Sequence, residues 1–181
     1  MPLNTEPVII GSQAFFIREG QAITLPSAGA ASKTLRPGPT ELTWIPLGAL
    51  LSVGEDGSPE EVKAYAPSPG HLEVSAVFQI KFQRKITLKT NEFGPMALEL
   101  QKRSAPLTSG STSATPNAQV QKLGWLKVVR HNQADGLIYT DYCWGALRFD
   151  GEALDDPTQI RESTFVFDVF KCDLNTVTIG T

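Results

Sequence analysis

The sequence predicts a mainly β protein: a β-sandwich or partly closed barrel with one short flanking helix, long loops and a terminal arm. Residues 78–90 alternate apolar and polar side chains with the period-2 spacing of a half-buried strand. Other apolar stretches of strand length lie between clusters of Gly, Pro, Asn and Asp, and only one segment is rich in good helix formers. Several strands with a single helix are typical of a sandwich or barrel-like domain.

Length and composition indicate one domain over residues 1–181. Of the 181 residues, 41% are hydrophobic and 19% are charged, which is enough apolar material for an ordinary core without metals or disulfides. The formal net charge of -3 argues against general nucleic-acid binding, which needs a basic surface. No apolar run approaches the roughly 18 residues of a membrane span. No secretory signal is expected, so the chain is expected to fold in a cytoplasm or after export by a route that leaves no signal.

Two segments are expected to lie outside the core. Residues 1–40 predict an extended N-terminal arm, in which two short apolar runs, 8–10 and 14–17, could each add one strand and are followed by a small, polar stretch rich in Gly and Pro. Residues 104–119 are rich in Ser, Thr, Ala and Pro and predict a flexible loop.

Residues 41–70 predict two strands with an acidic turn between them. Glu41–Val53 has the composition of a strand, and Pro46 within it predicts an edge or a bulge because proline cannot donate to a ladder. Residues 54–61 combine Gly, Pro and acidic residues and predict a turn. A short strand over 62–66 and a turn over 67–70 follow.

The strongest strand signal covers residues 78–90. Even positions are apolar except Arg84, so this face is expected to pack on the subunit core. The opposite face is polar and must meet solvent, a partner chain or a polar lumen. At about 3.3 Å per residue this strand spans roughly 40 Å, more than an average strand.

The second half predicts one helix and three strands. The helix is expected over residues 91–103, with Asn91 or Gly94 as its cap and a proline in its first turn. The strands are expected over residues 123–131, 137–149 and 160–173, the last one apolar on both faces and therefore covered on both.

Cys143 and Cys172 are expected to be reduced and mostly buried. If their two strands form a hairpin with a loop centred near Asp155, residue 143 opposes roughly residue 167. The remaining offset of five residues corresponds to roughly 16 Å, which is beyond the reach of a disulfide.

No pattern predicts a catalytic, cofactor or metal site. His71 and His131 are far apart in the sequence, and neither belongs to a ligand-spaced pair. The carboxylate pairs at 60–61 and 155–156 fall in predicted turns, where solvation is expected rather than a place across a cleft.

The basic face of the strand over 78–90 leaves three interpretations open. It is a solvated face whose lysines discourage edge pairing, a surface that meets acidic turns of a neighbouring subunit, or a direct contact to DNA. The candidate interface or lumen residues are Gln79, Lys81, Gln83, Lys85 and Lys89 on the strand and Glu60, Glu61, Asp155 and Asp156 in the turns.

Several stretches together resemble the major tail (tail tube) proteins of long-tailed bacteriophages. Residues 4–11 (Asn-Thr-Glu-Pro-Val-Ile-Ile-Gly) are similar to the start of such a subunit, and residues 44–48 (Trp-Ile-Pro-Leu-Gly) to the strand that opens the tube domain. Residues 62–100 follow the family's order of extended strand, turn, long strand and helix. Residues 123–128 (Leu-Gly-Trp-Leu-Lys-Val) resemble its second-half strand.

The resemblance implies a structural virion protein that is not an enzyme and binds no cofactor. In the family, six subunits form a ring, long strands of all subunits join into one inner barrel, and stacked rings form a hollow tail tube that delivers DNA. Implied partners are other copies, the tape-measure protein, and tail terminator and initiator proteins, with passing DNA not bound specifically and no membrane. The implied location is the virion tail, after assembly in the host bacterial cytoplasm.

One feature conflicts with this family. Its lumen is usually electronegative, so that DNA slides without sticking, whereas the polar face over residues 79–89 is basic. Most of these lysines are therefore expected to pair with acidic neighbours or to lie outside the channel.

Two alternative functions remain. One is a carbohydrate- or ligand-binding β-sandwich module with a platform of tryptophans, although apolar strand residues around each favour packing in a core or interface; these tryptophans are Trp44, Trp125 and Trp144. The other is the tube protein of a phage-derived secretion machine, for which the same kind of fold is expected.

Overall fold

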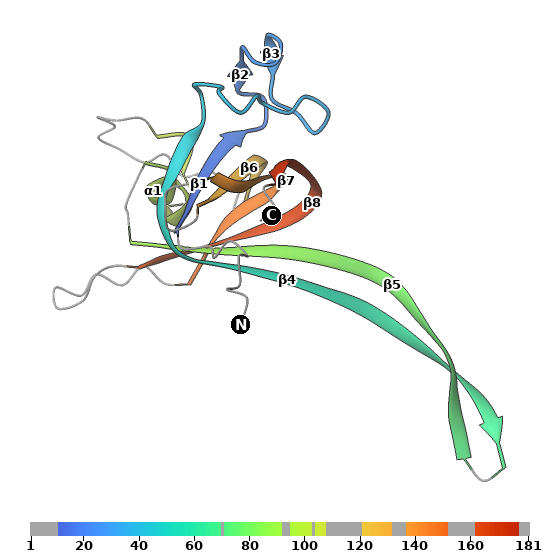
Figure 1. The fold of residues 1–181 in the computed structure, drawn as a ribbon. Coiled ribbons are helices and arrows are strands. Elements are labelled where there is room, and N and C mark those ends of the chain that lie inside the picture. Colours follow the sequence, from blue (N-terminus) through green and yellow to red (C-terminus); the bar gives the residue numbers. More distant parts are fainter. Residues whose placement is uncertain are drawn as a thin grey trace, which may run out of the picture.

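The computed structural model describes residues 11–69, 71–91, 95–102, 104–107, 121–131, 137–151 and 162–177. It contains eight strands and one helix in these ranges (Figure 1). In chain order they are β1 (Gly11–Arg18), β2 (Ala22–Ile23), β3 (Gly29–Ala30), β4 (Ile45–Ser68), β5 (His71–Thr90), α1 (Pro95–Lys102), β6 (Lys122–His131), β7 (Leu137–Asp150) and β8 (Ser163–Val177).

Six of the strands pair antiparallel around a barrel in the order β1-β4-β5-β8-β7-β6, and β6 pairs with β1 to close it. The short strands β2 and β3 form a separate sheet within residues 19–43, which lie over one end of the barrel in Figure 1. The predicted mainly β class with one short helix is confirmed. The pairing goes further than the prediction, because the ring of strands closes completely.

The first core lies among the inward faces of the barrel strands and one face of α1. Ile86 and Leu88 of β5 are fully buried there, which confirms the predicted inward face for this part of the strand. Phe165 and Phe167 of β8 and Met96 of α1 complete the contacts around them. The alternate spacing in the strands and the helical spacing in α1 both direct apolar side chains to one side.

Glu99 fastens α1 to the barrel. This carboxylate is fully buried, forms an ion pair with Arg18 of β1, and lies 3.3 Å from Nζ of Lys122 of β6. It also accepts a hydrogen bond from the backbone N–H of Leu107. A buried charge is tolerated only when it is paired in this way, so the short helix has one fixed position.

The second core lies on the outer face of β1, β6 and β7, under residues 19–43. Trp44, Trp125 and Trp144 are buried in it, which confirms the prediction that they pack in a core. The indole N–H of Trp125 donates to the carbonyl oxygen of Ser32 at 2.7 Å, and that of Trp44 donates to Gly38 at 2.9 Å. None of the three indoles forms an exposed platform.

Glu41 organises the segment over residues 19–43. Its buried carboxylate accepts hydrogen bonds from the backbone N–H groups of Leu25 and Thr24, both at 2.7 Å, and from that of Thr43 at 3.3 Å. These donors, the N–H of Leu25 foremost, lower the pKa of Glu41 from 4.5 to about 2.

Two predicted segments differ from the structure. The turn predicted over residues 54–61 is wrong, because β4 continues through it and pairs with β5 residue by residue. The strand considered for the apolar run 14–17 is confirmed within Gly11–Arg18, but this strand belongs to the barrel between β4 and β6, so its predicted place in an arm outside the core is wrong. In both cases long-range strand pairing overrides local composition. Residues 1–10 and most of the predicted loop 104–119 lie outside the described residues.

Pro46 occupies the position that was predicted for it. The pairing of β1 with β4 is irregular between Ala14 and Phe15, and Pro46 lies opposite Phe15 at this point. The bulge interrupts the ladder where proline lacks a donor.

Cys143 and Cys172 form a disulfide, so the prediction that both are reduced is wrong. They lie directly opposite each other on β7 and β8, with their Cα atoms 4.0 Å apart. The hairpin is centred at residue 157, because Asp150 pairs with Thr164, and a bulge between Trp144 and Gly145 shifts the register once more. The two effects together remove the offset of five residues.

Two further findings concern only the part of the chain that the structure describes. None of its helices is long and apolar enough to cross a membrane. It also contains no group of three or more His, Cys, Asp or Glu residues placed to hold a metal ion.

Glu41 should make the stability of the fold depend on pH. A group with a lowered folded-state pKa stabilises the fold at pH values above its unfolded pKa, and this contribution disappears as the pH falls through 4.5 toward about 2. We expect Glu41→Gln to melt at a lower temperature at neutral pH and to lose less stability on acidification, as measured by thermal melting between pH 7 and pH 2. The exposed Glu19→Gln is the matched control, and identical pH profiles for both variants would contradict the assignment.

The disulfide is expected to contribute to stability. It joins residues separated by 29 positions, and closing a loop of this size stabilises a fold by roughly 3–4 kcal/mol in the chain-entropy model. Urea unfolding of the wild-type chain should therefore shift to lower concentration on reduction. A double variant, Cys143→Ala with Cys172→Ala, should show no response to the reductant, whereas an unresponsive wild type would argue against the bond.

Candidate assembly surface

The β4–β5 hairpin extends beyond the barrel as a two-stranded ribbon (Figure 1). β4 pairs with β1 only up to Ala49, and β5 pairs with β8 only from Arg84 onward. Residues 58–68 of β4 and 71–83 of β5 therefore pair only with each other in the described structure, and we call this part the ribbon. Each ribbon strand has one edge along which no other described strand pairs with it. Isolated two-stranded ribbons are marginally stable, and open edges readily pair with another strand.

The ribbon also exposes apolar side chains. Tyr65 and Val74, which are cross-strand partners, are 57% and 51% exposed, and Val62 and Val77 are similarly exposed. A cross-strand pair of this kind usually stabilises a sheet by packing against a covered face. Open edges and exposed apolar side chains thus occur on the same element.

Two of the predicted polar residues of β5, Gln83 and Lys85, lie next to carboxylates of the same chain. Lys85 lies opposite Asp56 on β4 and opposite Asp168 on β8. The side-chain amide of Gln83 donates to Asp168 at 3.4 Å, and Lys89 is exposed. The register therefore places acidic residues of both neighbouring strands opposite Lys85.

In the ribbon, Glu60 lies opposite Lys81 and Glu61 lies opposite Gln79. Both glutamates belong to strand β4, so their predicted place in an exposed turn is wrong. The register shifts between Glu60 and Glu61, and this bulge interrupts the single alternation that was predicted from residue 79 to residue 89. The side chains of these four residues lie outside the described ones, as do Asp155 and Asp156 altogether.

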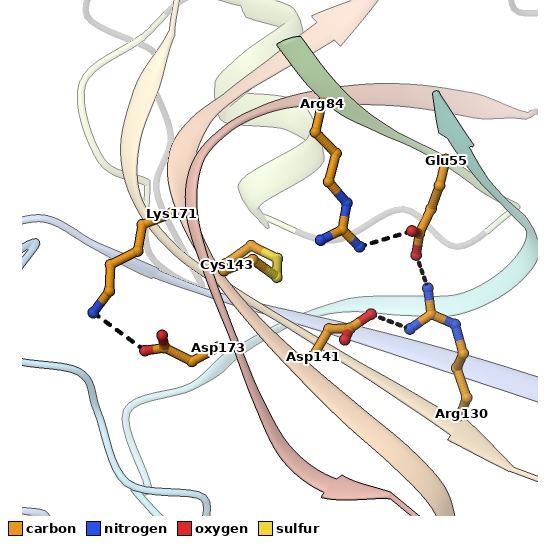
Figure 2. Close-up of a disulfide and its surroundings, with 8 residues drawn as sticks. Glu55, Arg84, Arg130, Asp141, Cys143, Lys171 and Asp173 are labelled. Atoms are coloured by element: carbon orange, nitrogen blue, oxygen red, sulfur yellow. Dashed lines mark hydrogen bonds and ion pairs between the residues drawn. A yellow bond between two sulfur atoms is a disulfide. The ribbon is translucent and has the colours of Figure 1, made fainter. Parts of the chain in front are cut away.

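A chain of ion pairs lies where the ribbon leaves the barrel (Figure 2). Glu55 of β4 accepts a hydrogen bond from Arg84 of β5 at 2.7 Å and another from Arg130 of β6. The other end of the Arg130 guanidinium donates to Asp141 of β7 at 2.5 Å. These four residues are the root network.

The root network connects strands that are not neighbours in the barrel. β4 and β5 are hydrogen-bonded to β1 and β8, whereas Arg130 and Asp141 come from β6 and β7. The side chains of Arg130 and Asp141 are only 5% and 4% exposed, and Arg130 lies 4.6 Å from the centre of the Tyr139 ring. Burial also raises the pKa of Tyr139. The network therefore ties the base of the ribbon to the far wall of the barrel.

Sequence analysis did not identify the root network as a site. Its signal was Arg84, the one charged residue among the apolar even positions of the strand over 78–90. A charge at such a position predicts a buried partner. The partners could not be named, because Glu55 was assigned to a turn and Arg130 and Asp141 come from distant strands.

The similarity of this chain to known proteins lies in its structure. No family model and no curated protein matches the chain. Among solved structures, it is similar to a chain of the anti-feeding prophage (AFP) baseplate, determined by cryo-EM with 6-fold symmetrisation. The TM-score is 0.49 and the identity is 10%, over 98% of this chain and 100% of that chain. Chains this different need not share a function.

The buried pair of the root network, Arg130 and Asp141, should contribute strongly to stability. Removing Arg130 leaves the buried Asp141 without its partner, and breaking a buried pair costs about 3–5 kcal/mol. We expect Arg130→Met to lower the free energy of unfolding by that amount in urea titrations, and Arg130→Met with Asp141→Leu to recover part of it.

Arg84→Met is the matched control for this prediction, because Arg84 and Glu55 are partly exposed. Pairs of this kind contribute about 0–1 kcal/mol. Equal losses for Arg130→Met and Arg84→Met would show that burial does not set the strength of the network.

Proposed function

We propose that this chain is a non-enzymatic structural subunit that assembles with copies of itself through the ribbon. The observation that carries the proposal is the pair of open strand edges that the ribbon presents together with exposed apolar side chains. A monomer has no element among its described residues that pairs with these edges. A second copy supplies strands of the same length and composition.

Pairing between copies would remove the open edges. An added strand gains main-chain hydrogen bonds along its whole length, and alternate side chains gain packing partners. When the contact joins two different surfaces of the subunit, copies associate head to tail, and they form a ring if the rotation closes. A ring of ribbons is a continuous sheet without edges.

The resemblance to major tail proteins supplies the finer form of the proposal. Six subunits form each ring, the rings stack, and the hollow tube in the virion tail is the conduit for DNA delivery. The tape-measure protein and the tail terminator and initiator proteins are its further partners. Acidic residues lie opposite Lys85 and would neutralise its charge within the subunit. This favours a tube lumen to which passing DNA does not bind.

The alternative functions differ in their support. A carbohydrate platform of tryptophans is disfavoured, because Trp44, Trp125 and Trp144 are all buried. The tube of a phage-derived secretion machine uses the same assembly, and the neighbouring genes distinguish it from a virion tail.

Removal of the ribbon should abolish assembly. Ser58 and Gln83 are register partners, so a two-residue Asn-Gly turn can replace residues 59–82 and close a shorter hairpin. Wild-type protein is expected to form rings or tubes in negative-stain images, at high concentration or with an initiator complex. The ribbonless variant should keep its circular dichroism spectrum and its disulfide but run as a monomer in light scattering.

The control variant is Leu42→Ser, which removes exposed apolar surface outside the ribbon. It should assemble as the wild type does. The proposal fails if the ribbonless variant still forms rings, or if the wild-type chain stays monomeric under all of these conditions.

A further inference from the structure

The departure of the ribbon leaves a second open edge, on β8. β5 and β8 pair from Thr90 and Ser163 to Arg84 and Val169, and there the two strands separate. β5 continues into the ribbon, whereas Phe170–Val177 stays on the barrel and pairs with β7 on one side only. Figure 1 shows the two strands diverging from this point. We call Phe170–Val177 the acceptor edge.

The register defines which groups the acceptor edge presents. In an antiparallel pair, residues with close Cα atoms are not hydrogen-bonded to each other, and their N–H and C=O groups point to the opposite side. Cys143 and Cys172 have Cα atoms 4.0 Å apart and form such a pair. The N–H groups of Cys172 and, two residues later, Leu174 therefore point away from β7, toward the side that β5 has left.

We propose that the acceptor edge binds the ribbon of a second copy, through the open edge of β5 in that copy. This inference rests on the proposed function and names the surface that receives the ribbon. The second copy's β5 would take the place that β5 of the same chain would have occupied if it had stayed beside β8. Every copy then donates one ribbon and offers one acceptor edge, which is the head-to-tail arrangement that closes a ring.

Three observations favour this occupant. Residues 71–83 of β5 contain neither proline nor glycine, so every residue there has a backbone N–H, whereas β4 is interrupted by Pro59 and Pro67. The acceptor edge spans about 26 Å at roughly 3.3 Å per residue, and the open edge of β5 is longer than this. Phe170, where the strands separate, is 59% exposed, as large a fraction as Tyr65 of the ribbon, so the pairing would cover apolar side chains on both partners.

The test uses one residue of the acceptor edge. Leu174→Pro removes an N–H that points to the open side and leaves the bonds to β7 in place, and prolines are tolerated on such edges. The full-length variant should be a folded monomer with an intact disulfide and should form no rings. Leu174→Ala keeps the N–H and is the matched control, so it should assemble like the wild type.

Mixing the two defective variants gives the sharpest result. Leu174→Pro retains a ribbon, and the ribbonless variant retains an acceptor edge. Each should be monomeric alone, and together they should form a 1:1 heterodimer in light scattering, with no rings. The inference is overturned if Leu174→Pro assembles like the wild type while the ribbonless variant does not, an outcome that leaves the proposed function standing. A wild-type chain that never assembles would instead overturn the proposed function.

Hydrogen exchange of the wild-type chain provides a readout that does not depend on how Leu174→Pro folds. The amides of Cys172 and Leu174 should exchange at least about tenfold more slowly in rings than in monomers, because only paired amides are protected. Equal exchange in both forms would contradict the inference. Protection already present in the monomer would show that the chain's own terminal residues cover the edge, and this too would overturn it.

Discussion

The pairing of β4 with β5 is the constraint on which the rest of the structure depends. A single antiparallel ladder, with register shifts at three points, joins Leu50 with Thr90 at the base and Ser68 with His71 at the tip. The base forms part of the barrel wall, and the tip extends beyond it. Because the same two strands are hydrogen-bonded to each other in both parts, the ribbon is a continuation of the barrel wall and not a separate loop. The two strands therefore leave the barrel together and open an edge on β8.

The root network explains how the ribbon keeps a defined direction. A two-stranded ribbon that leaves a barrel has few contacts to hold its angle, and side chains at its base must supply them. Glu55 and Arg84 are held through Arg130 and Asp141, which belong to strands on the other side of the ring. Directional charge-assisted hydrogen bonds restrain orientation better than apolar contacts of the same size. The buried Arg130–Asp141 pair is thus expected to carry the stability, and the Glu55–Arg130 pair, which joins β4 to β6, is expected to restrain the base of the ribbon.

The two sides of the barrel differ in how they are covered. The outer face of β1, β6 and β7 is covered by residues 19–43, which Glu41 and the indole N–H groups of Trp44 and Trp125 hold in place. The open edges lie on the other side, on β4, β5 and β8. Among the described residues, the open strand edges therefore lie away from the face that residues 19–43 cover.

The sequence by itself determined the class of the fold and most strand positions. Alternation identified the buried face of β5 at Ile86 and Leu88, and β6 and β7 were predicted to within one residue at each end. The missing donor of Pro46 located a bulge. These features depend only on residues that are close to one another in the sequence. They also identified β5 as the element of greatest interest, although its partner strand was divided by a turn that does not exist.

Only the tertiary structure decided the register, and the candidate site depends on the register. Residues 54–61 have the composition of a turn, yet they form a strand because β5 offers them a complete ladder. Cys143 meets Cys172 because the hairpin is centred two residues later than expected and contains a bulge. Arg84 pairs with Glu55 of β4, and Glu55 also pairs with Arg130 of β6, a strand far away in the sequence. Periodicity shows which residues share a face of one strand, but a shift of a single residue between strands changes every partner, and that shift is set by contacts across the whole barrel.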